Sequence, residues 1–152
     1  MKAVQKPISG EEEKETLTPP VEALSNFYEA FNNRDLEKMA RNWAQTDDIS
    51  MDNPLGGITR GWSEIKAVYG QIFRGPAKVK VEFFDYALHQ TEEIFYAVGR
   101  ERGEFCLSNT IIKLAIRTTR IYCLMDGTWR QVHHHGSIDD PELLTRYQKA
   151  VR

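Results

Sequence analysis

Cysteine and long apolar runs are scarce in this sequence, and both absences exclude classes of protein. The 152 residues include two cysteines, Cys106 and Cys123, which lack the C-x-x-C spacing of zinc and redox motifs. We expect reduced thiols in or near the core rather than a disulfide framework. No run of about 18 apolar residues occurs, and no basic stretch followed by an apolar one opens the chain. Neither a membrane span nor a secretion signal is therefore predicted, and a cytoplasmic protein is expected.

An excess of positive charge is also lacking. Lys and Arg together number 20 and Asp and Glu 22, which gives a formal net charge of -2. Proteins that bind nucleic acid need a basic surface that neutralises phosphates. Nucleic acid is therefore not an expected partner.

The chain is long enough for one domain with a real core, because a chain of this size buries on the order of two thirds of its unfolded surface. Residues 1–20 combine an acidic run with three prolines and have no apolar period, which is typical of a mobile arm. We expect a mobile acidic N-terminal arm over residues 1–20 and a single folded domain over residues 21–152.

The first half of the domain has helical periodicity. Apolar residues at helical spacing predict a helix that begins at Val21 and ends before Asn32. Asp35 can cap a second helix. A third helix is expected between Ile65 and Phe73, with Gly75-Pro76 as its end.

The second half alternates apolar and polar residues, which predicts strands over residues 79–88, 94–102, 110–124 and 129–138, after a short strand at 49–52. The phase of the alternation changes near Phe84, which indicates a bulge in a curved sheet. Asp126-Gly127 is a hairpin turn, and Asp140-Pro141 opens a short C-terminal helix. Helices followed by an antiparallel meander predict an α+β fold.

Three segments, in this order and spacing, resemble the nuclear-transport-factor-two-like superfamily: FYEAFNNRDLEKM, DNPLGG with RGWSEIKAVYGQIF, and TTRIYCLMDGTWRQVHHHGS. The similarity is greatest to SnoaL-like proteins and to the association domain of calcium/calmodulin-dependent protein kinase, and ketosteroid isomerases form a third related branch. The resemblance implies a cone: a curved antiparallel sheet wrapped around three N-terminal helices, with a pocket inside.

Two arginines are candidates for this pocket. Arg120 belongs to the more apolar phase of strand 110–124, and Arg100 shares a phase with Ile94, Tyr96 and Val98. A buried charge needs a carboxylate, hydrogen bonds or a ligand anion. The arginines either pair with local acids such as Glu82 or Glu101, emerge at the sheet rim, or face a ligand. The resemblance favours a ligand, because the kinase association domain carries pocket arginines at the positions that match these two.

The turn length decides which histidine of the HHH run faces the pocket. A two-residue loop places Arg120 opposite His133, whereas a three-residue loop of Met125, Asp126 and Gly127 places it opposite Val132. The resemblance favours the longer loop, and His134 then lies on the inner face with Arg120 and Tyr122. On the outer face we expect the alternating residues Trp129, Gln131, His133, His135 and Ser137.

A metal site is not expected. His133 and His135 could chelate an ion from one strand face, but the sequence contains no partner motif that would supply a third ligand. No cofactor is expected either.

We do not expect this chain to catalyse steroid isomerisation by the mechanism of the ketosteroid isomerases. Their base lies in a D-P-x-G turn, where this sequence has Asn53, an amide that accepts no proton at useful pH. By the same resemblance the second aspartic acid of that family falls on Arg120 and the oxyanion tyrosine on Phe27, with Tyr28 displaced by one residue. Only the supporting tyrosine is retained, as Tyr69.

The sequence therefore leaves two hypotheses. The first is a homodimeric protein whose pocket binds a small, partly apolar, anionic or carbonyl compound; any reaction would be that of an isomerase, cyclase or dehydratase. His134 and Arg120 are its catalytic candidates, and Asn53, Tyr69, Arg100 and Tyr122 its ligand contacts. Each also has a structural reading, such as a core tyrosine or a turn asparagine. The second hypothesis is a non-catalytic association module that assembles through the outer sheet face with Trp129, His133 and His135.

Overall fold

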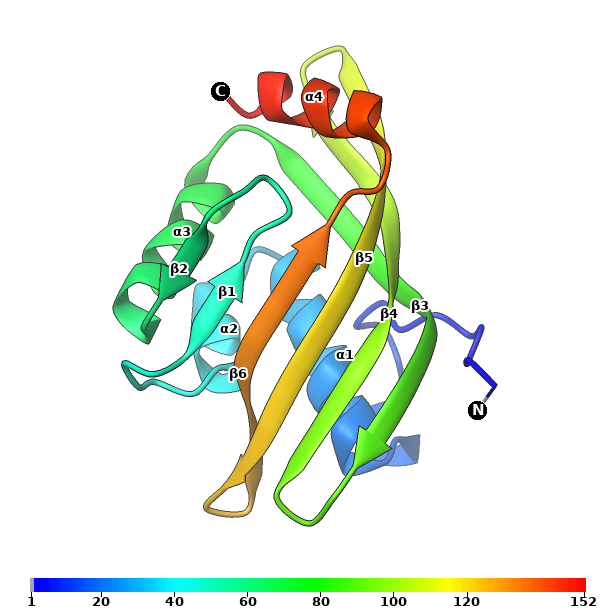
Figure 1. The fold of residues 1–152 in the computed structure, drawn as a ribbon, viewed down its shortest axis with the longest axis vertical. Coiled ribbons are helices and arrows are strands. Elements are labelled where there is room, and N and C mark those ends of the chain that lie inside the picture. Colours follow the sequence, from blue (N-terminus) through cyan, green and yellow to red (C-terminus); the bar gives the residue numbers. More distant parts are fainter. Residues whose placement is uncertain (1) are drawn as a thin grey trace.

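The computed structural model describes residues 2–152, which form four α-helices, one 3-10 turn (Lys14–Thr16) and a six-stranded sheet (Figure 1). The elements are α1 (Pro19–Asn32), α2 (Leu36–Asn42), β1 (Ser50–Asp52), β2 (Ile58–Arg60), α3 (Trp62–Arg74), β3 (Lys78–Gln90), β4 (Ile94–Leu107), β5 (Thr110–Met125), β6 (Thr128–Ser137) and α4 (Pro141–Ala150). The predicted α+β class is confirmed. Within residues 2–152 no helix has both the length and the apolar character needed to cross a membrane.

Local sequence signals account for the helix ends. Pro19 lies in the first turn of α1, where its missing N–H costs nothing. The Asp35 side chain accepts a hydrogen bond from the Lys38 amide at 2.9 Å and so caps α2 as expected. Asp140 caps α4 in the same way, through the amides of Glu142 and Leu143.

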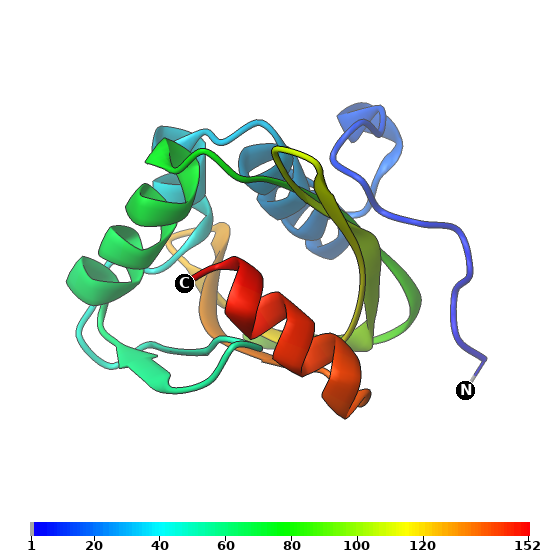
Figure 2. The ribbon, with the colours of Figure 1, turned by 90° about the horizontal axis from the view of Figure 1, so that it is seen from above.

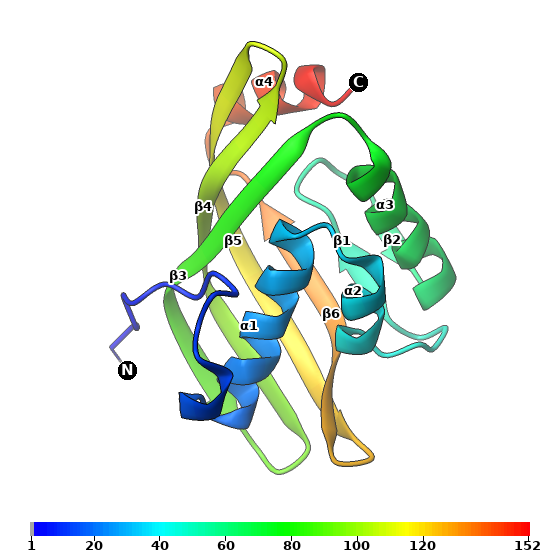
Figure 3. The ribbon, with the colours of Figure 1, turned by 180° about the vertical axis from the view of Figure 1, so that it is seen from behind.

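The sheet has the order β2-β1-β6-β5-β4-β3 and curves around the helices. Figure 2 shows the curvature from above, and Figure 3 shows α1 and α2 within the concave side. A register shift between Phe84 and Ala87 is the predicted bulge in β3. The sheet is mixed rather than wholly antiparallel, because β1 pairs in parallel with β6. A three-residue strand carries no pattern that identifies its partner, so the sequence did not predict this pairing.

The hairpin between β5 and β6 corrects the expected turn length. Met125 pairs with Thr128, so the loop contains two residues, Asp126 and Gly127, and not three. Both have positive φ, 50° and 78°, as in a type I′ turn, whose second position suits glycine because it has no Cβ to clash.

A bulge in β6 follows the turn. The register shifts between Ile121 and Tyr122, so that Arg120 lies opposite His134 and neither Val132 nor His133. Before the shift Trp129 and Gln131 are buried, and after it His134 and Gly136 are buried. The outer-face prediction for Trp129 and Gln131 is wrong, because the extra residue reverses the alternation between them and the histidines.

The N-terminal arm, expected to be mobile, lies along the edge of β3 in the structure. The Val4 amide donates to the Tyr86 carbonyl at 2.7 Å and the Ile8 amide to the Phe83 carbonyl at 2.8 Å. The Ile8 side chain is 2% exposed. Gly10 lies so close to α1 that a Cβ would approach the Glu29 nitrogen to 2.3 Å. These contacts describe a docked segment.

Candidate functional site

The cone encloses a cavity of about 700 Å³ between the concave face of the sheet, α1, α3 and α4. This volume is within the range of ordinary small-molecule sites. Most of the lining side chains are apolar or aromatic, among them Phe27, Phe31, Met51, Leu55, Val68, Tyr69, Ile72, Val79, Val81, Phe105, Leu114, Ile116 and Tyr147. Six side chains with amide, charged or imidazole groups also line it: Asn53, Gln71, Glu101, Arg120, His134 and Arg152.

Arg120 is 2% exposed and has a partner at each guanidinium nitrogen. Nε donates to the Tyr28 hydroxyl at 3.2 Å, Nη1 to Gln131 Oε1 at 2.8 Å, and Nη2 to Glu101 Oε1 at 2.8 Å. The guanidinium carbon lies 3.5 Å from the centroid of the Phe27 ring. Of the alternatives that the sequence left open, the structure contains the ion pair with Glu101.

The Glu101 carboxylate is held mainly through one oxygen. Oε1 accepts from the Tyr28 hydroxyl at 2.7 Å as well as from Arg120. Oε2 accepts no hydrogen bond from residues 2–152, and Glu101 lines the cavity. The pair as a whole carries no net charge, and one carboxylate oxygen remains available to a ligand.

Tyrosine hydroxyls around this pair stay protonated. Burial raises the pKa of Tyr28 well above its usual value, although the Arg120 charge opposes the change. Burial likewise raises the pKa of Tyr69 to about 12, and again Arg120 acts in the opposite direction. These hydroxyls can donate hydrogen bonds but do not act as bases near neutral pH.

His134 lies beside Arg120 on the inner face, 7% exposed, and lines the cavity. Among the described residues neither ring nitrogen has a hydrogen-bond partner. Burial lowers the pKa of His134 well below its usual value, and the Arg120 charge lowers it further. The imidazole is therefore neutral, with one N–H donor and one acceptor nitrogen not used by the protein.

Two of the expected ligand contacts do not reach the cavity. Arg100 lies on the outer face, with its side chain 54% exposed and paired with Asp85 at 3.3 Å. Tyr122 is fully buried, is not part of the cavity lining, and donates to Asn42 Oδ1 at 3.0 Å. From the sequence, Arg100 was expected among the inward-facing residues of β4, but in the structure the other set of alternating residues faces inward.

Asn53 and Tyr69 do line the cavity, and each also has a structural role. Asn53 Oδ1 accepts from the Leu55 amide at 2.9 Å and so shapes the turn after β1. Tyr69 packs edge-on against Phe27, with ring centroids 6.4 Å apart.

Sequence reasoning missed Glu101 as a cavity residue. The inner phase of β4 reads Phe95, Ala97, Gly99, Glu101, Gly103 and Phe105, and it becomes recognisable only when the strand is followed beyond residue 102 to Phe105. The strand predicted from the sequence ended at residue 102 and so excluded Phe105. Within that shorter strand the alternating set Ile94, Tyr96 and Val98 was the more apolar of the two, although in the structure these three side chains are exposed.

The model of the SnoaL-like domain family matches residues 21–141. The chain belongs to the SnoaL-like family. Among proteins of curated function, none matches this SnoaL-like domain in sequence.

Solved structures share its fold. A candidate calcium/calmodulin-dependent protein kinase type II association domain from Thiobacillus denitrificans is 23% identical, with a TM-score of 0.65 over 82% of this chain and 98% of that one. A candidate dehydratase of the NTF2-like family from Streptomyces avermitilis is 18% identical, with a TM-score of 0.69 over 76% and 89%. An NTF2-like superfamily protein from Salmonella enterica is 20% identical, with a TM-score of 0.68 over 76% and 85%. The SnoaL-like domain thus has a fold that in general belongs to ligand-binding or enzymatic families.

Proposed function

We propose that this SnoaL-like domain binds a small, largely apolar compound that carries a carbonyl group, with His134 and Glu101 as the polar groups at the carbonyl end. One observation carries the proposal: a neutral imidazole with no protein partner lies in the wall of an apolar cavity. A buried polar group without a hydrogen bond costs about 1–3 kcal/mol, and a ligand that pairs with it recovers that free energy.

The charges of the site favour a neutral ligand over an anion. Arg120 is already paired with Glu101, and its guanidinium face is covered by Phe27. Arg100, the second arginine expected for an anion, points away from the cavity. Arg152, the other arginine of the lining, lies at the exposed end of the chain. An anionic ligand beside His134 would therefore add an uncompensated charge to an apolar space, which is costly. A carbonyl compound needs only a donor.

The same groups support proton transfer next to that carbonyl, the step shared by isomerases, cyclases and dehydratases. The lowered pKa of His134 makes it a poor base but a good neutral donor to a carbonyl oxygen. Glu101 Oε2 is the proton acceptor, and Arg120 and Tyr28 hold the carboxylate in position through Oε1. His134 thus polarises the carbonyl oxygen while Glu101 takes the proton from the adjacent carbon.

The binding proposal can be tested with three probes that share the fluorene ring system: fluorenone, fluorene and fluorene-9-carboxylate. We expect fluorenone to raise the melting temperature most. The hydrogen bond to His134, at about 1–3 kcal/mol, corresponds to roughly fivefold to 150-fold tighter binding than fluorene. His134→Leu should remove the preference for the ketone, and Arg100→Ala, on the outer face, should retain it. Stabilisation by the carboxylate above the ketone, or by none of the three, would refute the proposal.

The chemical step has a separate test in deuterium exchange at the carbon next to the carbonyl of 2-indanone, followed by NMR in heavy water. We expect wild type to accelerate the exchange and Glu101→Gln to abolish the acceleration, while Arg100→Ala keeps it. If Glu101→Gln binds fluorenone and still exchanges at the wild-type rate, Glu101 is not the base.

A second role, self-association as a homodimer, is supported by an exposed apolar patch on the outer face of β4. The patch consists of Ile94, Tyr96 and Val98, which are 44%, 40% and 47% exposed. Apolar side chains grouped in this way are typical of an interface. Trp129, which the sequence assigned to this face, packs inside against Phe95 instead.

Light scattering tests the association. We expect a wild-type dimer and a Val98→Lys monomer that still binds fluorenone, because the patch and the cavity lie on opposite faces of the sheet. The matched control Arg117→Lys keeps the charge of an exposed β5 residue and should stay dimeric. A wild-type monomer at high concentration would rule the homodimer out.

A further inference from the structure

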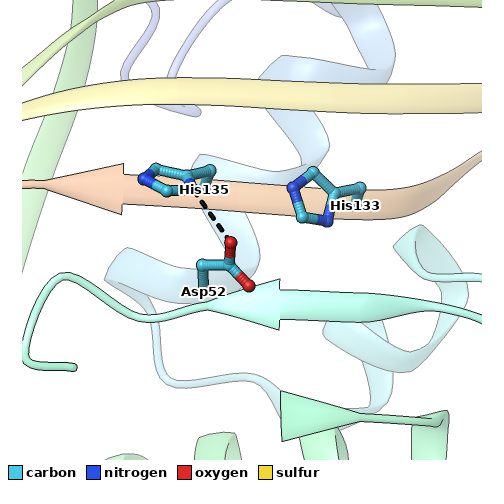
Figure 4. A group of neighbouring side chains, drawn as sticks. All are labelled: Asp52, His133 and His135. Carbon is cyan, nitrogen blue, oxygen red and sulfur yellow. Dashed lines mark hydrogen bonds and ion pairs between the residues drawn. The ribbon is translucent and has the colours of Figure 1, made fainter. Parts of the chain in front are cut away.

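Two histidines and one aspartate meet on the outer face of the sheet, away from the cavity. His133 and His135 project from the same side of β6, and Asp52 lies beside them on β1 (Figure 4). The parallel register pairs Ser50 with His133 and Asp52 with His135. One potential ligand atom from each of the three side chains lies within 4.8 Å of those of the other two.

The contacts within the group orient the imidazoles and leave donor atoms free. His133 Nδ1 lies 2.8 Å from Ser50 Oγ, and His135 Nδ1 lies 2.9 Å from Asp52 Oδ2. Neither Nε2 atom has a hydrogen-bond partner within residues 2–152. In the same part of the chain Asp52 forms no ion pair with Lys or Arg. The His135 side chain is 54% exposed and that of Asp52 23%, so an ion can approach from solvent.

We propose that Asp52, His133 and His135 bind a divalent transition-metal ion of the zinc, cobalt or nickel type. Two imidazole nitrogens and one carboxylate oxygen form a ligand set that suits these ions better than Mg²⁺ or Ca²⁺, which favour oxygen alone. Ligand atoms about 2.0–2.1 Å from zinc lie about 3.3 Å apart in a tetrahedron. We expect rotation of the three side chains to close the present spacing, which is within 4.8 Å, to that value, and water to complete the coordination.

The third ligand explains why the sequence predicted no metal site. A strand with histidines two residues apart supplies only two ligands, and Asp52 is 81 residues before His133 in the chain. The parallel pairing of β1 with β6 brings the Asp52 carboxylate beside the histidines, and no local sequence pattern predicts this pairing. The metal site is independent of the proposed function, because Met51, which precedes Asp52, and His134, which separates the two histidines, face the cavity on the other side.

Cobalt is the probe, because its visible absorption reports coordination by imidazole and carboxylate. The chain is prepared without a histidine tag and titrated with Co²⁺, then with Zn²⁺ in competition. We expect one Co²⁺ per chain, displaced by one Zn²⁺, and a melting temperature raised by either ion, since the ion links β1 to β6.

Single substitutions identify the ligands. His133→Ala, His135→Ala and Asp52→Asn should each weaken binding tenfold or more. Ser50→Ala, which frees the His133 ring without removing a ligand, should weaken it about tenfold. The controls are His89→Ala, an exposed histidine on β3, and His134→Leu, the cavity-facing member of the run. Both should bind Co²⁺ as wild type does, and circular dichroism verifies that every variant is folded.

Two results would overturn the proposal. One is the lack of stoichiometric Co²⁺ binding by folded wild type. The other is an equal loss of binding in His89→Ala or His134→Leu and in His135→Ala, which would mean diffuse binding to histidines. Because the readouts are metal binding and melting temperature, a negative result here leaves the cavity proposal untouched.

Discussion

Arg120 and Glu101 bring opposite charges into an interior that is otherwise apolar. Burial of the two ions costs free energy that their attraction and hydrogen bonds must offset. Substitution of both side chains should therefore destabilise the protein less than substitution of one. The arginine on the neighbouring strand, Arg100, provides a comparison, since it forms its ion pair with Asp85 in solvent.

For Arg120→Met we expect a loss of about 3–5 kcal/mol in the free energy of unfolding, because Glu101 is left charged and buried without its cation. Adding Glu101→Gln should recover a large part of that loss. Arg100→Met should cost less than about 1 kcal/mol, as is usual for an exposed pair. Urea denaturation of the four proteins measures these values, and similar losses in Arg120→Met and Arg100→Met would contradict the argument.

The buried neutral imidazole of His134 makes stability depend on pH. In the unfolded chain the histidine takes up a proton as pH falls through about 6.5, whereas in the folded protein its pKa is well below that value. Between the two pKa values the unfolded state binds more protons. The free energy of unfolding is therefore greatest above pH 6.5 and decreases as pH falls, by up to about 1.4 kcal/mol per pH unit from this residue.

Urea denaturation at pH values from about 7.5 to about 5.5 tests this dependence. His134→Leu removes the titrating group, so its free energy of unfolding should fall less steeply than that of wild type in acid. Identical slopes in wild type and His134→Leu would show that His134 does not titrate as argued.

At the level of the elements, the helices and the meander followed from capping residues and alternation, but strand pairing did not. The expected three-residue turn was wrong, and the bulge near Val132 was not foreseen. The turn is one residue shorter than expected, and the bulge adds one residue to β6. After the bulge the two errors compensate, so His134 lies on the inner face as expected. Between turn and bulge they do not cancel, and Gln131, a partner of Arg120, was assigned to the wrong face.

The reason is physical. A strand pair with a bulge and one without it have nearly equal numbers of backbone hydrogen bonds. Which of the two forms depends on which side chains are buried on the inner face. Here the shift buries Gln131 beside Arg120 as well as His134. Satisfying a buried guanidinium is a property of the whole packed interior, which the alternation of one strand does not contain.

Removing Val132 tests this account of the bulge. Without it, β5 and β6 can form a regular ladder in which Gln131 still pairs with Tyr122 and His134 with Arg120. We expect a folded protein that loses less than about 2 kcal/mol in the free energy of unfolding and responds to fluorenone as wild type does.

Removal of Arg130 is the matched control. It brings Val132 to the inner face and turns Gln131 outward, which leaves Arg120 Nη1 without its acceptor. This deletion should cost at least about 1–3 kcal/mol more than removal of Val132. Equal costs, measured by urea denaturation, would mean that the bulge does not serve to orient Gln131.

At the scale of the whole molecule, one curved sheet separates two environments. Its concave face, closed by the helices, holds the cavity with Glu101 and His134, and its convex face carries the three residues of the proposed metal site. Because the side chains of β6 alternate between these faces, three consecutive histidines have two different surroundings. Sequence periodicity predicted that the histidines of β6 lie on two faces. The residues that accompany them, Asp52 on one face and Glu101 on the other, were identified only from the positions of β1 and β4 in the sheet.

The N-terminal arm completes the molecule at the free edge of β3. An edge strand exposes unpaired amides and carbonyls, and here the carbonyls of Val4 and Ile8 accept from the amides of Tyr86 and Phe83 at 3.1 and 2.9 Å. Burial of the Ile8 side chain contributes about 1.5–3 kcal/mol to this docking, and the 43% exposed Val4 contributes less.

Hydrogen exchange distinguishes this docked arm from the mobile arm expected from composition. The amides of Phe83 and Tyr86 should exchange slowly in wild type and in Val4→Ala, and much faster in Ile8→Ala, since the loss of the buried anchor shifts the arm toward its detached state. Amides in β5, which the arm does not contact, should be unchanged in all three proteins. If Phe83 and Tyr86 exchange in wild type as fast as in a chain that lacks residues 2–10, the arm is mobile in solution and the edge of β3 is open.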